Sequence, residues 1–564
     1  MKKGLRNRET IICIGLLAAA LFLCYLPYMQ RGLYTGLDST FHLARLESLA
    51  DSLKNGVFPV KVHSEMCFGY GYGTGFFYSD IPLYGPALLL MAGVPLGLTY
   101  KIFQLAIMAA VLGTSFYAVW RLTGKAIPAT GAAVTVLLSA RMLDSVYHVA
   151  SLGHTMAMIF VPLAIVGCWL LLQGQKTWLL SVGFIGLLLT HTISAVMAAM
   201  VCAVLIIFSI DKIIKAPVII GRFLVSALVA VASTITWWLP MLEQMAVQTY
   251  KVSQPWVFVS ENVCTWRNLF AGAYGSGVVV TIVLLSVSAY IAVRLLRRGK
   301  VSRAQLTMTG ASLVITGLTM WPQFWRVMQP VLNFMQFPYR LYFMTTVLTA
   351  LAFGLAVSEF LDGREQGKAR VWIGAAAILA VLISSTVTGY RYFSEPMFTG
   401  ERELWDDRKI TQEVRGVGGG AEWLPAETSG NHFDTPTVAY DNEGSGAEGA
   451  KEKGDTIFSV YLNMEKEYYD MPYVYYYGYQ AYRQDGTPLT VVKSGRDGLV
   501  RVLLPEGGSG VEQITVVYRK TVLQKAAYLL FGAWAAGAAA VLLYRRFGKT
   551  GCLRKREWGN RADE

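Results

Sequence analysis

The chain has 564 residues, of which 54% are hydrophobic and 15% are charged, and apolar runs of membrane-spanning length recur from Thr10 onward. This composition excludes a soluble globular protein and predicts an integral membrane protein. The formal net charge of +13 does not indicate nucleic-acid binding, because Lys and Arg gather in short clusters between apolar runs, which is the pattern that sets membrane topology.

The first apolar run follows a basic segment that contains Lys2, Lys3, Arg6 and Arg8. A signal peptide has the same arrangement, but this run is about 20 residues long and lacks a small-x-small cleavage site. We therefore expect an uncleaved anchor that enters from the cytoplasm and leaves the next loop on the outer side.

The second apolar run, Ile81–Leu98, contains Pro82, Pro86 and Pro95, so a surface-lying or re-entrant helix is expected there rather than a full span. With this choice, every later basic cluster falls on the cytoplasmic side. The predicted spans are Thr10–Met29, Thr99–Leu122, Ile127–Ala140, His154–Leu172, Trp178–Thr190, Ser194–Ile210, Phe223–Leu242, Gly272–Val293, Gln305–Trp321, Tyr339–Phe360, Val371–Tyr390 and Ala526–Tyr544. The predicted cytoplasmic segments are Arg121–Lys125, Gln173–Lys176, Lys212–Arg222, Arg294–Arg303, Arg364–Arg370 and the tail from Arg545. About twelve spans with both termini in the cytoplasm are thus predicted.

The segment 391–525 has no spanning run, and its second half alternates as β-strands do. The predicted strands are Thr456–Leu462, Tyr473–Tyr479, Leu489–Val492, Leu499–Leu504 and Gln513–Tyr518, with turns at Asp485-Gly486 and Arg496-Asp497-Gly498. Gly416–Gly420 and Asn442–Gly454 have the composition of flexible linkers. The predicted fold is a mainly α polytopic domain over 1–390, a small outer all-β domain over 391–525, and a last span with a basic tail over 526–564.

The outer loop between Tyr34 and Tyr84 holds the first candidate site residues. If a helix begins near Asp38, then Asp38, His42 and Arg45 share one of its faces. Asp38 could equally be only a helix N-cap, which Asp does well.

Further unusual polar residues map to the same outer membrane face, where charges are costly to bury without a use. They are Asp80, Asp144, His148, His154, His191 and Arg340. Each also has a structural reading: Arg340 could snorkel to the interface, and Asp144 could form a local ion pair with Arg141.

Together these residues suit transfer of a group from a phosphate-linked carrier. A carboxylate, for which Asp38, Asp80 and Asp144 are candidates, can accept the proton of an acceptor hydroxyl. Carboxylates and histidines, for which Asp38, Asp144 and His154 are the candidates, can hold a divalent metal such as Mg²⁺ or Mn²⁺. The fork of Arg340 can pair with a phosphate. No Walker-type loop is present, so a nucleotide cofactor is not expected.

These features resemble the GT-C superfamily of polyprenyl-phosphate-dependent glycosyltransferases. The motifs Gly36-Leu37-Asp38 with Phe41-His42-Leu43-Ala44-Arg45, Asn55-Gly56 with Phe58-Pro59-Val60, Gly69-Tyr70-Gly71-Tyr72, Phe76-Phe77-Tyr78-Ser79-Asp80 and Gln336-Phe337-Pro338-Tyr339-Arg340 are similar to those of bacterial YfhO-type membrane proteins. The resemblance implies that Asp38 acts as base or metal ligand, that Asp144 is the second-loop acid and that Asp80 is the acidic end of the aromatic motif. His154 stands where relatives tend to have Glu.

The resemblance implies an enzyme of the bacterial cytoplasmic membrane that moves a sugar, with inversion, from a polyprenyl-phosphate carrier to an envelope glycopolymer, lipid or protein on the outer face. In that reading Tyr78, His42, Arg45, His148, His191 and Arg340 bind substrate. The alternatives are a transporter or flippase of a lipid-linked or envelope precursor and an inactive scaffold. A transporter should show interrupted helices with ionisable groups near mid-membrane, whereas the groups here sit at outer ends.

Overall fold

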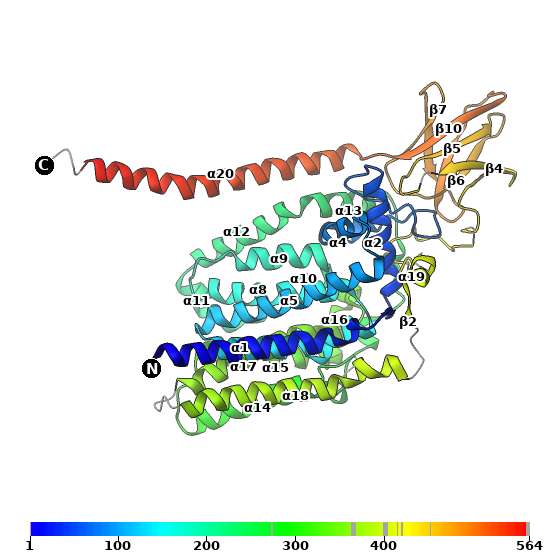
Figure 1. Ribbon diagram of the computed structural model, residues 1–564. Coiled ribbons are helices and arrows are strands. Elements are labelled where there is room, and N and C mark those ends of the chain that lie inside the picture. The colour runs from blue at the N-terminus through cyan, green and yellow to red at the C-terminus, as the bar shows by residue number, and fades with distance from the viewer. Residues whose placement is uncertain are drawn as a thin grey trace.

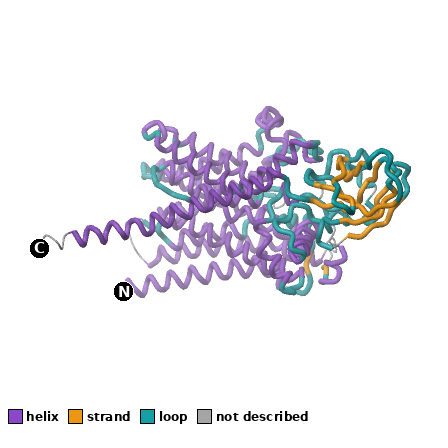
Figure 2. Tube along the Cα trace, turned by 90° about the horizontal axis from the view of Figure 1, so that it is seen from above, coloured by secondary structure: helices purple, strands orange, loops and turns teal. Residues whose placement is uncertain are grey.

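The computed structural model describes residues 2–271, 274–362, 368–398, 404–413, 416–418, 421–431, 433–451 and 453–559. A bundle of helices carries a β-barrel at one end, and the last helix returns from the barrel along the side of the bundle (Figure 1). Seen from above, all strands of the barrel lie beyond that one end of the bundle (Figure 2).

The long helices are the predicted apolar segments. They are α1 (Lys2–Tyr25), α5 (Leu96–Thr123), α6 (Ala126–Leu137), α8 (Leu152–Leu172), α9 (Leu179–Thr190), α10 (Thr192–Phe208), α12 (Val218–Ser233), α13 (Ile235–Val247), α14 (Val278–Leu296), α15 (Arg303–Thr319), α17 (Tyr342–Leu361), α18 (Lys368–Phe398) and α20 (Val522–Gly559). The shorter helices are α2 (Ser39–Lys54), α3 (Thr74–Phe77), α4 (Tyr84–Met91), α7 (Ala140–Leu143), α11 (Ile210–Lys215), α16 (Pro322–Leu332) and α19 (Asp407–Glu413).

Among the described residues, seven helices are long and apolar enough to cross a membrane, or up to nine if each of two bent pairs is one span. Each of the twelve predicted segments contains a helix, but α9 and α10 are shorter apolar helices and α15 has only 17 residues. Residue 272, the predicted start of one span, and residues 364–367 of one predicted basic loop lie outside the described residues. The protein is a multi-pass membrane protein, with fewer spans supported by length and composition than predicted.

Helix α4 follows the expectation for Ile81–Leu98. It has eight residues and is therefore too short to cross a bilayer. A turn with Gly93 at φ +88° separates it from α5, which Pro95 precedes as N-cap. The chain thus enters the next span from the side on which α4 lies.

The predicted single span Phe223–Leu242 is instead broken into α12 and α13, which are bent by 73°. At the break the hydroxyl of Thr234 donates to the carbonyl of Ala230, 2.9 Å away, a back-bond that often bends helices. The consequence is that α13 turns towards the barrel. Its Gln244 donates to the carbonyl of Tyr477 at 2.8 Å, and Gln248 donates to that of Tyr475 at 3.0 Å.

The barrel is closed and antiparallel, in the order β10-β5-β4-β3-β6-β9-β8-β7. Its strands are β3 (Val438–Asp441), β4 (Gly446–Lys451), β5 (Phe458–Asn463), β6 (Tyr468–Val474), β7 (Tyr479–Arg483), β8 (Pro488–Lys493), β9 (Leu499–Leu503) and β10 (Val511–Tyr518). The predicted all-β domain is confirmed, as are the turns at Gly486 and Asp497, which have positive φ. Two details of the prediction are wrong. Most of Asn442–Gly454 is strand β4 and its flanking turns rather than a linker. The predicted strand Tyr473–Tyr479 is the end of β6, the connection 475–478 and the first residue of β7.

The first outer loop is clamped between the bundle and the barrel. The backbone N–H of Val474 donates to the carbonyl of Tyr70 at 2.8 Å, and Lys451 donates to the carbonyl of Gly69 at 2.7 Å. A two-residue strand, β1 (Leu33–Tyr34), pairs antiparallel with β2 (Leu404–Trp405). Helix α2 is consequently buried on nearly all sides, including His42 and Arg45.

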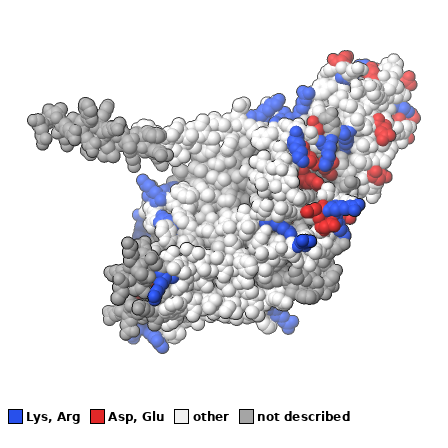
Figure 3. Space-filling model, viewed as in Figure 1, with Lys and Arg blue, Asp and Glu red and all other residues white. Residues whose placement is uncertain are grey.

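Charged side chains separate the two ends of the molecule. On the face shown in Figure 3, acidic and basic side chains lie side by side near the barrel, and Lys and Arg side chains lie on parts of the opposite end. The broad zone between these two ends is largely uncharged. The start of α1 and the end of α20 both lie at the end away from the barrel (Figure 1). An uncharged belt between polar ends is what a bilayer requires.

Candidate functional site

The first and second outer loops meet at Asp38. The backbone N–H groups of Leu37 and Asp38 donate to the carbonyls of His148 and Val149, at 3.1 and 2.8 Å. Gly36 permits this approach, because a Cβ there would lie 2.6 Å from the His148 carbonyl oxygen. Asp38 is thereby held at the start of α2, directly beside the second loop.

The Asp38 side chain faces other polar groups instead of capping the helix. Asp38 stands at the N-cap position of α2, but its side chain makes no capping hydrogen bond. Burial and the nearby Glu422 carboxylate raise the pKa of Asp38 to about 6, against the opposing effects of Arg340 and a hydrogen bond with Ser151. Asp38 is therefore a carboxylate that can exchange a proton near neutral pH, which the capping alternative alone would not produce.

Arg340 reaches this region from the motif that precedes α17. Its guanidinium donates to the carbonyl of Met335 at 3.1 Å and to Oε1 of Gln336 at 2.8 Å. It also lies 5.5 Å from the ring centroid of Phe337. These neutral partners leave its charge to act on Asp38 and Glu422, both of which interact with it electrostatically.

Three histidines line the same region. The ring centroids of His154 and His191 are 4.1 Å apart, and Nδ1 of His191 caps α10 by accepting from the backbone of Ser194 at 3.2 Å. Burial and Arg340 lower the pKa of His191 to about 3, and burial, Arg45 and His191 lower that of His42 well below its ordinary value. Both rings are neutral at physiological pH, so they can offer hydrogen bonds without charge.

Tyr78 joins the histidines because residue 153 is glycine. A Cβ at Gly153 would lie 1.5 Å from the Tyr78 hydroxyl oxygen and 3.2 Å from Cδ2 of His191. The ring of Tyr78 also lies under the Arg45 guanidinium, 4.3 Å from its centroid. A side chain at position 153 would displace the tyrosine from the cluster.

Several buried polar atoms around this cluster have no hydrogen-bond partner within the described part of the chain. They are Nδ1 of His42, Nε2 of His154, Nε and Nη1 of Arg141, and Oγ of Ser145. Leaving a buried donor or acceptor unpaired costs about 1–3 kcal/mol, and more for a charged group. Water or a ligand that enters this region can supply the missing hydrogen-bond partners.

Asp144 is closed off from this region. Its Oδ2 is 2.8 Å from Nη2 of Arg141 and its Oδ1 is 3.0 Å from Nδ1 of His148, and its side chain is fully buried. All three belong to α7 and the π-helical turn Asp144–His148 that follows it. Arg141 in turn lies over the rings of Phe343 and Tyr339, at 4.9 and 5.4 Å. Asp144 therefore positions Arg141 and His148 rather than presenting a free carboxylate beside Asp38.

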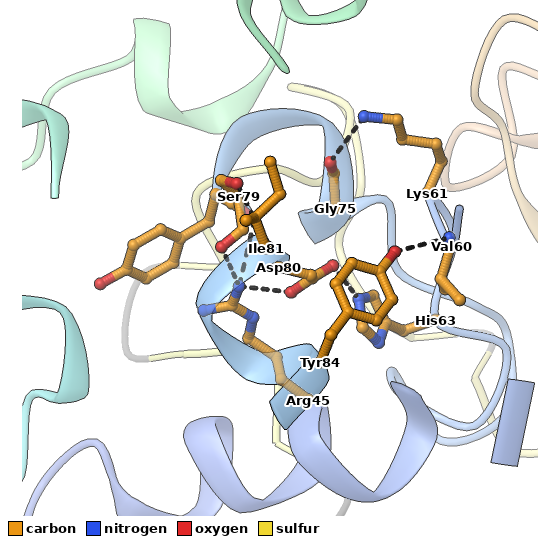
Figure 4. Close-up of polar contacts among 10 residues, drawn as sticks. Arg45, Val60, Lys61, His63, Gly75, Ser79, Asp80, Ile81 and Tyr84 are labelled. Atoms are coloured by element: carbon orange, nitrogen blue, oxygen red, sulfur yellow. Dashed lines mark hydrogen bonds and ion pairs between the residues drawn. The ribbon is translucent and has the colours of Figure 1, made fainter. Parts of the chain in front are cut away.

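Asp80 is also enclosed, as Figure 4 shows. Its Oδ1 lies 2.5 Å from Nη2 of Arg45, and its Oδ2 lies 2.8 Å from Nε2 of His63. Arg45 donates further to the carbonyl of Tyr78 at 3.1 Å. Burial would raise the pKa of Asp80, but His63 and Arg45 outweigh it and bring it to about 2. Asp80 and Arg45 thus fix the loop that carries Tyr78.

The residues suggested as metal ligands do not come together. In the ranges that the structure describes, no group of three or more His, Cys, Asp or Glu side chains could hold a metal ion. Asp144 has both oxygens engaged by Arg141 and His148. The predicted set of Asp38, Asp144 and His154 does not fit a metal ion.

Two residues of the site follow the predicted linker and were missed. Glu422 acts on Asp38 and Arg340, and Trp423 stacks on Phe77 with ring centroids 6.2 Å apart. The described part of the linker, Gly416–Gly418, packs against the start of α2: a Cβ at Gly416 would lie 3.1 Å from Thr40 Oγ1. The sequence signal for these residues was an acidic residue followed by an aromatic one, Glu422-Trp423, just after the glycine-rich segment Gly416–Gly420.

Comparison with known proteins gives little further information. No protein-family model matches the chain, and no curated protein matches it. Among solved structures it is similar to the arabinofuranosyltransferase AftD from Mycobacteria, with 14% identity and a TM-score of 0.41. That likeness covers 69% of this chain and 27% of the AftD chain, so this chain matches about a quarter of that protein.

Proposed function

We propose that the protein is a membrane glycosyltransferase of the GT-C type, which moves a sugar from a polyprenyl-phosphate carrier to an envelope acceptor. The observation that carries this proposal is the position of Asp38, which the contact between the two outer loops holds at the start of α2 without a capping bond. Arg340 acts on this carboxylate, and burial and Glu422 raise its pKa to about 6. A base poised near neutral pH next to a fixed cation suits attack by a hydroxyl on a phosphate-linked carbon.

The reaction uses Asp38 as general base. The Asp38 carboxylate takes the proton of an acceptor hydroxyl, whose oxygen forms a bond to the anomeric carbon of the donor sugar. The bond between that carbon and the phosphate oxygen breaks, and its electron pair leaves with the phosphate. Attack opposite the leaving group inverts the anomeric centre. Arg340 stabilises the charge that grows on the phosphate.

The neutral groups around Asp38 suit a sugar. His42, His154 and Tyr78 can donate or accept hydrogen bonds, and the first two carry unpaired ring nitrogens among the described residues. Sugar hydroxyls pair with uncharged donors and acceptors of this kind. Arg141, held by Asp144, adds N–H groups at the edge of the same region that have no hydrogen-bond partner in the ranges that the structure describes.

The proposal places the reaction on the outer face of the bacterial cytoplasmic membrane. The site lies at the barrel end of the bundle, and both ends of the described chain lie at the other end. The basic segments Lys212–Lys215 and Arg294–Arg298 support a cytoplasmic position for the end away from the barrel, by the positive-inside rule. The barrel is a candidate acceptor-binding module.

The direct test is donor cleavage by the full chain in proteoliposomes. The probe is a panel of polyprenyl-phosphate hexoses with isolated envelope glycans as acceptors, and the readout is release of polyprenyl phosphate. Movement of an intact donor between leaflets without cleavage would support the flippase alternative and overturn the enzyme reading.

Replacing Arg340 by Gln is expected to weaken binding of polyprenyl phosphate by about 10- to 100-fold, because one charge-assisted contact of about 1.5–3 kcal/mol is lost. Binding can be measured in nanodiscs by native mass spectrometry or fluorescence displacement. Arg297→Gln is the matched control, since Arg297 is exposed at the far end of α14. Equal affinity of the two variants would remove Arg340 from the phosphate site.

Replacing Glu422 by Gln is expected to move the acid limb of the pH–rate profile to lower pH. Glu422 raises the pKa of Asp38, so its neutralisation lowers that pKa and keeps the base ionised in more acidic solution. The measurement is kcat/KM between pH 4.5 and 8. Glu427→Gln is the control, because Glu427 pairs with Lys493 at 2.5 Å. Superimposable acid limbs for both variants would separate Glu422 from the titrating group.

A further inference from the structure

Helix α16 has a broad apolar face, and only part of that face packs against protein. Trp325 and Leu332 are buried, and Trp325 Nε1 donates to the carbonyl of Leu318 at 2.7 Å. Val327 and Val331, one helical turn apart, are instead 75% and 65% exposed. Arg326 projects about 100° away from Val327 around the helix axis. The described part of the chain thus leaves this valine pair largely uncovered.

The polar side of α16 is fixed to the segment before α14. The backbone N–H of Val259 donates to Oδ1 of Asn333 at 3.0 Å, and Nδ2 of Asn333 donates to the carbonyl of Val257 at 3.1 Å. Gln329 accepts from the hydroxyl of Ser260. These bonds determine which face of the helix turns outward.

The connectivity of the chain places α16 at the barrel end of the bundle. It joins the end of α15 to the start of α17, and it lies in the half of the bundle nearer the barrel (Figure 1). The segment that holds it belongs to the same end, because the N–H groups of Lys251 and Val252 donate to the carbonyls of Leu424 and Glu422 at 3.0 and 2.8 Å. A helix that links two spans at one end of a bundle lies at the level of the membrane surface.

The surroundings have the composition of a bilayer interface. Trp256, Trp266 and Trp321 are each more than half exposed, and Phe334 is also exposed. Tryptophan concentrates where headgroups meet acyl chains, because its ring is apolar and its N–H is polar. From Trp321 to Phe334 the chain has no acidic residue and one basic residue, Arg326.

We propose that α16 lies in the outer leaflet, with Val327 and Val331 in the boundary between headgroups and acyl chains and Arg326 towards water. The occupant of the exposed face is the lipid bilayer itself. Because Gln336 and Arg340 follow α16 directly, leaflet phosphates lie at the depth of the candidate site. If the proposed function holds, a lipid-linked donor therefore reaches Arg340 along α16.

The immersion is tested with the full chain in nanodiscs of phosphatidylglycerol and phosphatidylethanolamine. An environment-sensitive fluorophore is attached at V327C, V331C or R326C, in a background with Cys552→Ser; the other six cysteines are buried. The expected result is blue-shifted emission at 327 and 331, quenched several-fold more strongly by shallow nitroxide lipids than at 326. Equal quenching at 326 and 327 overturns the proposal. A blue shift without lipid quenching also overturns it, since protein then covers the face.

A second measurement separates this inference from the proposed function. The double variant Val327→Asp/Val331→Asp is expected to weaken binding of a long-chain polyprenyl phosphate about tenfold, because charged residues leave the apolar boundary. A short-chain, water-soluble analogue should bind unchanged. Unchanged long-chain binding overturns the route along α16, whereas lipid quenching at 327 with no polyprenyl-phosphate binding by the parent chain overturns only the proposed function.

Discussion

Replacing Asp38 by Asn is expected to lower sugar transfer by about 10²- to 10⁴-fold, because an amide cannot accept the proton of the acceptor hydroxyl. Asn has nearly the same shape, and Asp38 makes no capping bond to α2 that the change would break. The readout is release of polyprenyl phosphate in proteoliposomes, alongside the amount of inserted protein.

The control for this change is Asp211→Asn. Asp211 is an exposed carboxylate that pairs with Arg303 far from Asp38 in the chain, so its loss should leave transfer unchanged. If the Asp38 variant transfers sugar at the parent rate when equal amounts of protein are inserted, Asp38 is not the general base and the proposed mechanism is wrong.

Replacing Asp80 by Asn is expected to destabilise the protein by about 3–5 kcal/mol, because it leaves the buried Arg45 without its counter-ion. The measurement is the apparent Tm in detergent, together with transfer per folded molecule. Asp485→Asn, in an exposed turn of the barrel, is the matched control. A variant that melts like the parent but no longer transfers sugar would restore Asp80 as a reacting group.

The same pair gives a pH dependence with a definite sign. The pKa of Asp80 in the folded state is about 2, below its ordinary value of 3.8. The ionised form is therefore favoured by folding, and the stabilisation is present above about pH 4 and is lost as the pH falls towards 2. The parent should show this acid loss of Tm more strongly than Asp80→Asn does.

The sequence predicted the site in part. Helix α2 begins where Asp38 indicated, and Asp38, His42, His191 and Arg340 do lie around one region. The sequence could not rank Asp38, Asp80 and Asp144, because all three are acidic residues in outer loops. The three residues differ in their partners. Arg45 and His63 enclose Asp80, and Arg141 and His148 enclose Asp144. Asp38 instead has a raised pKa and can exchange a proton near neutral pH.

The sequence by itself determined those structural features that depend on residues close together in the chain. Apolar runs placed the helices, prolines marked Ile81–Leu98 as too interrupted to span, and alternation with Gly turns located the barrel, since hydropathy and backbone preference act within a few residues. Only the tertiary structure decided that Thr234 divides one predicted span, that residues 446–451 form a strand, and that Glu422 acts on Asp38. The effect of Glu422 on Asp38 depends on charges that lie far apart in the chain. The break at Thr234 and the strand at 446–451 depend on a back-bond to Ala230 and on pairing with β3 and β5, which hydropathy and alternation do not record.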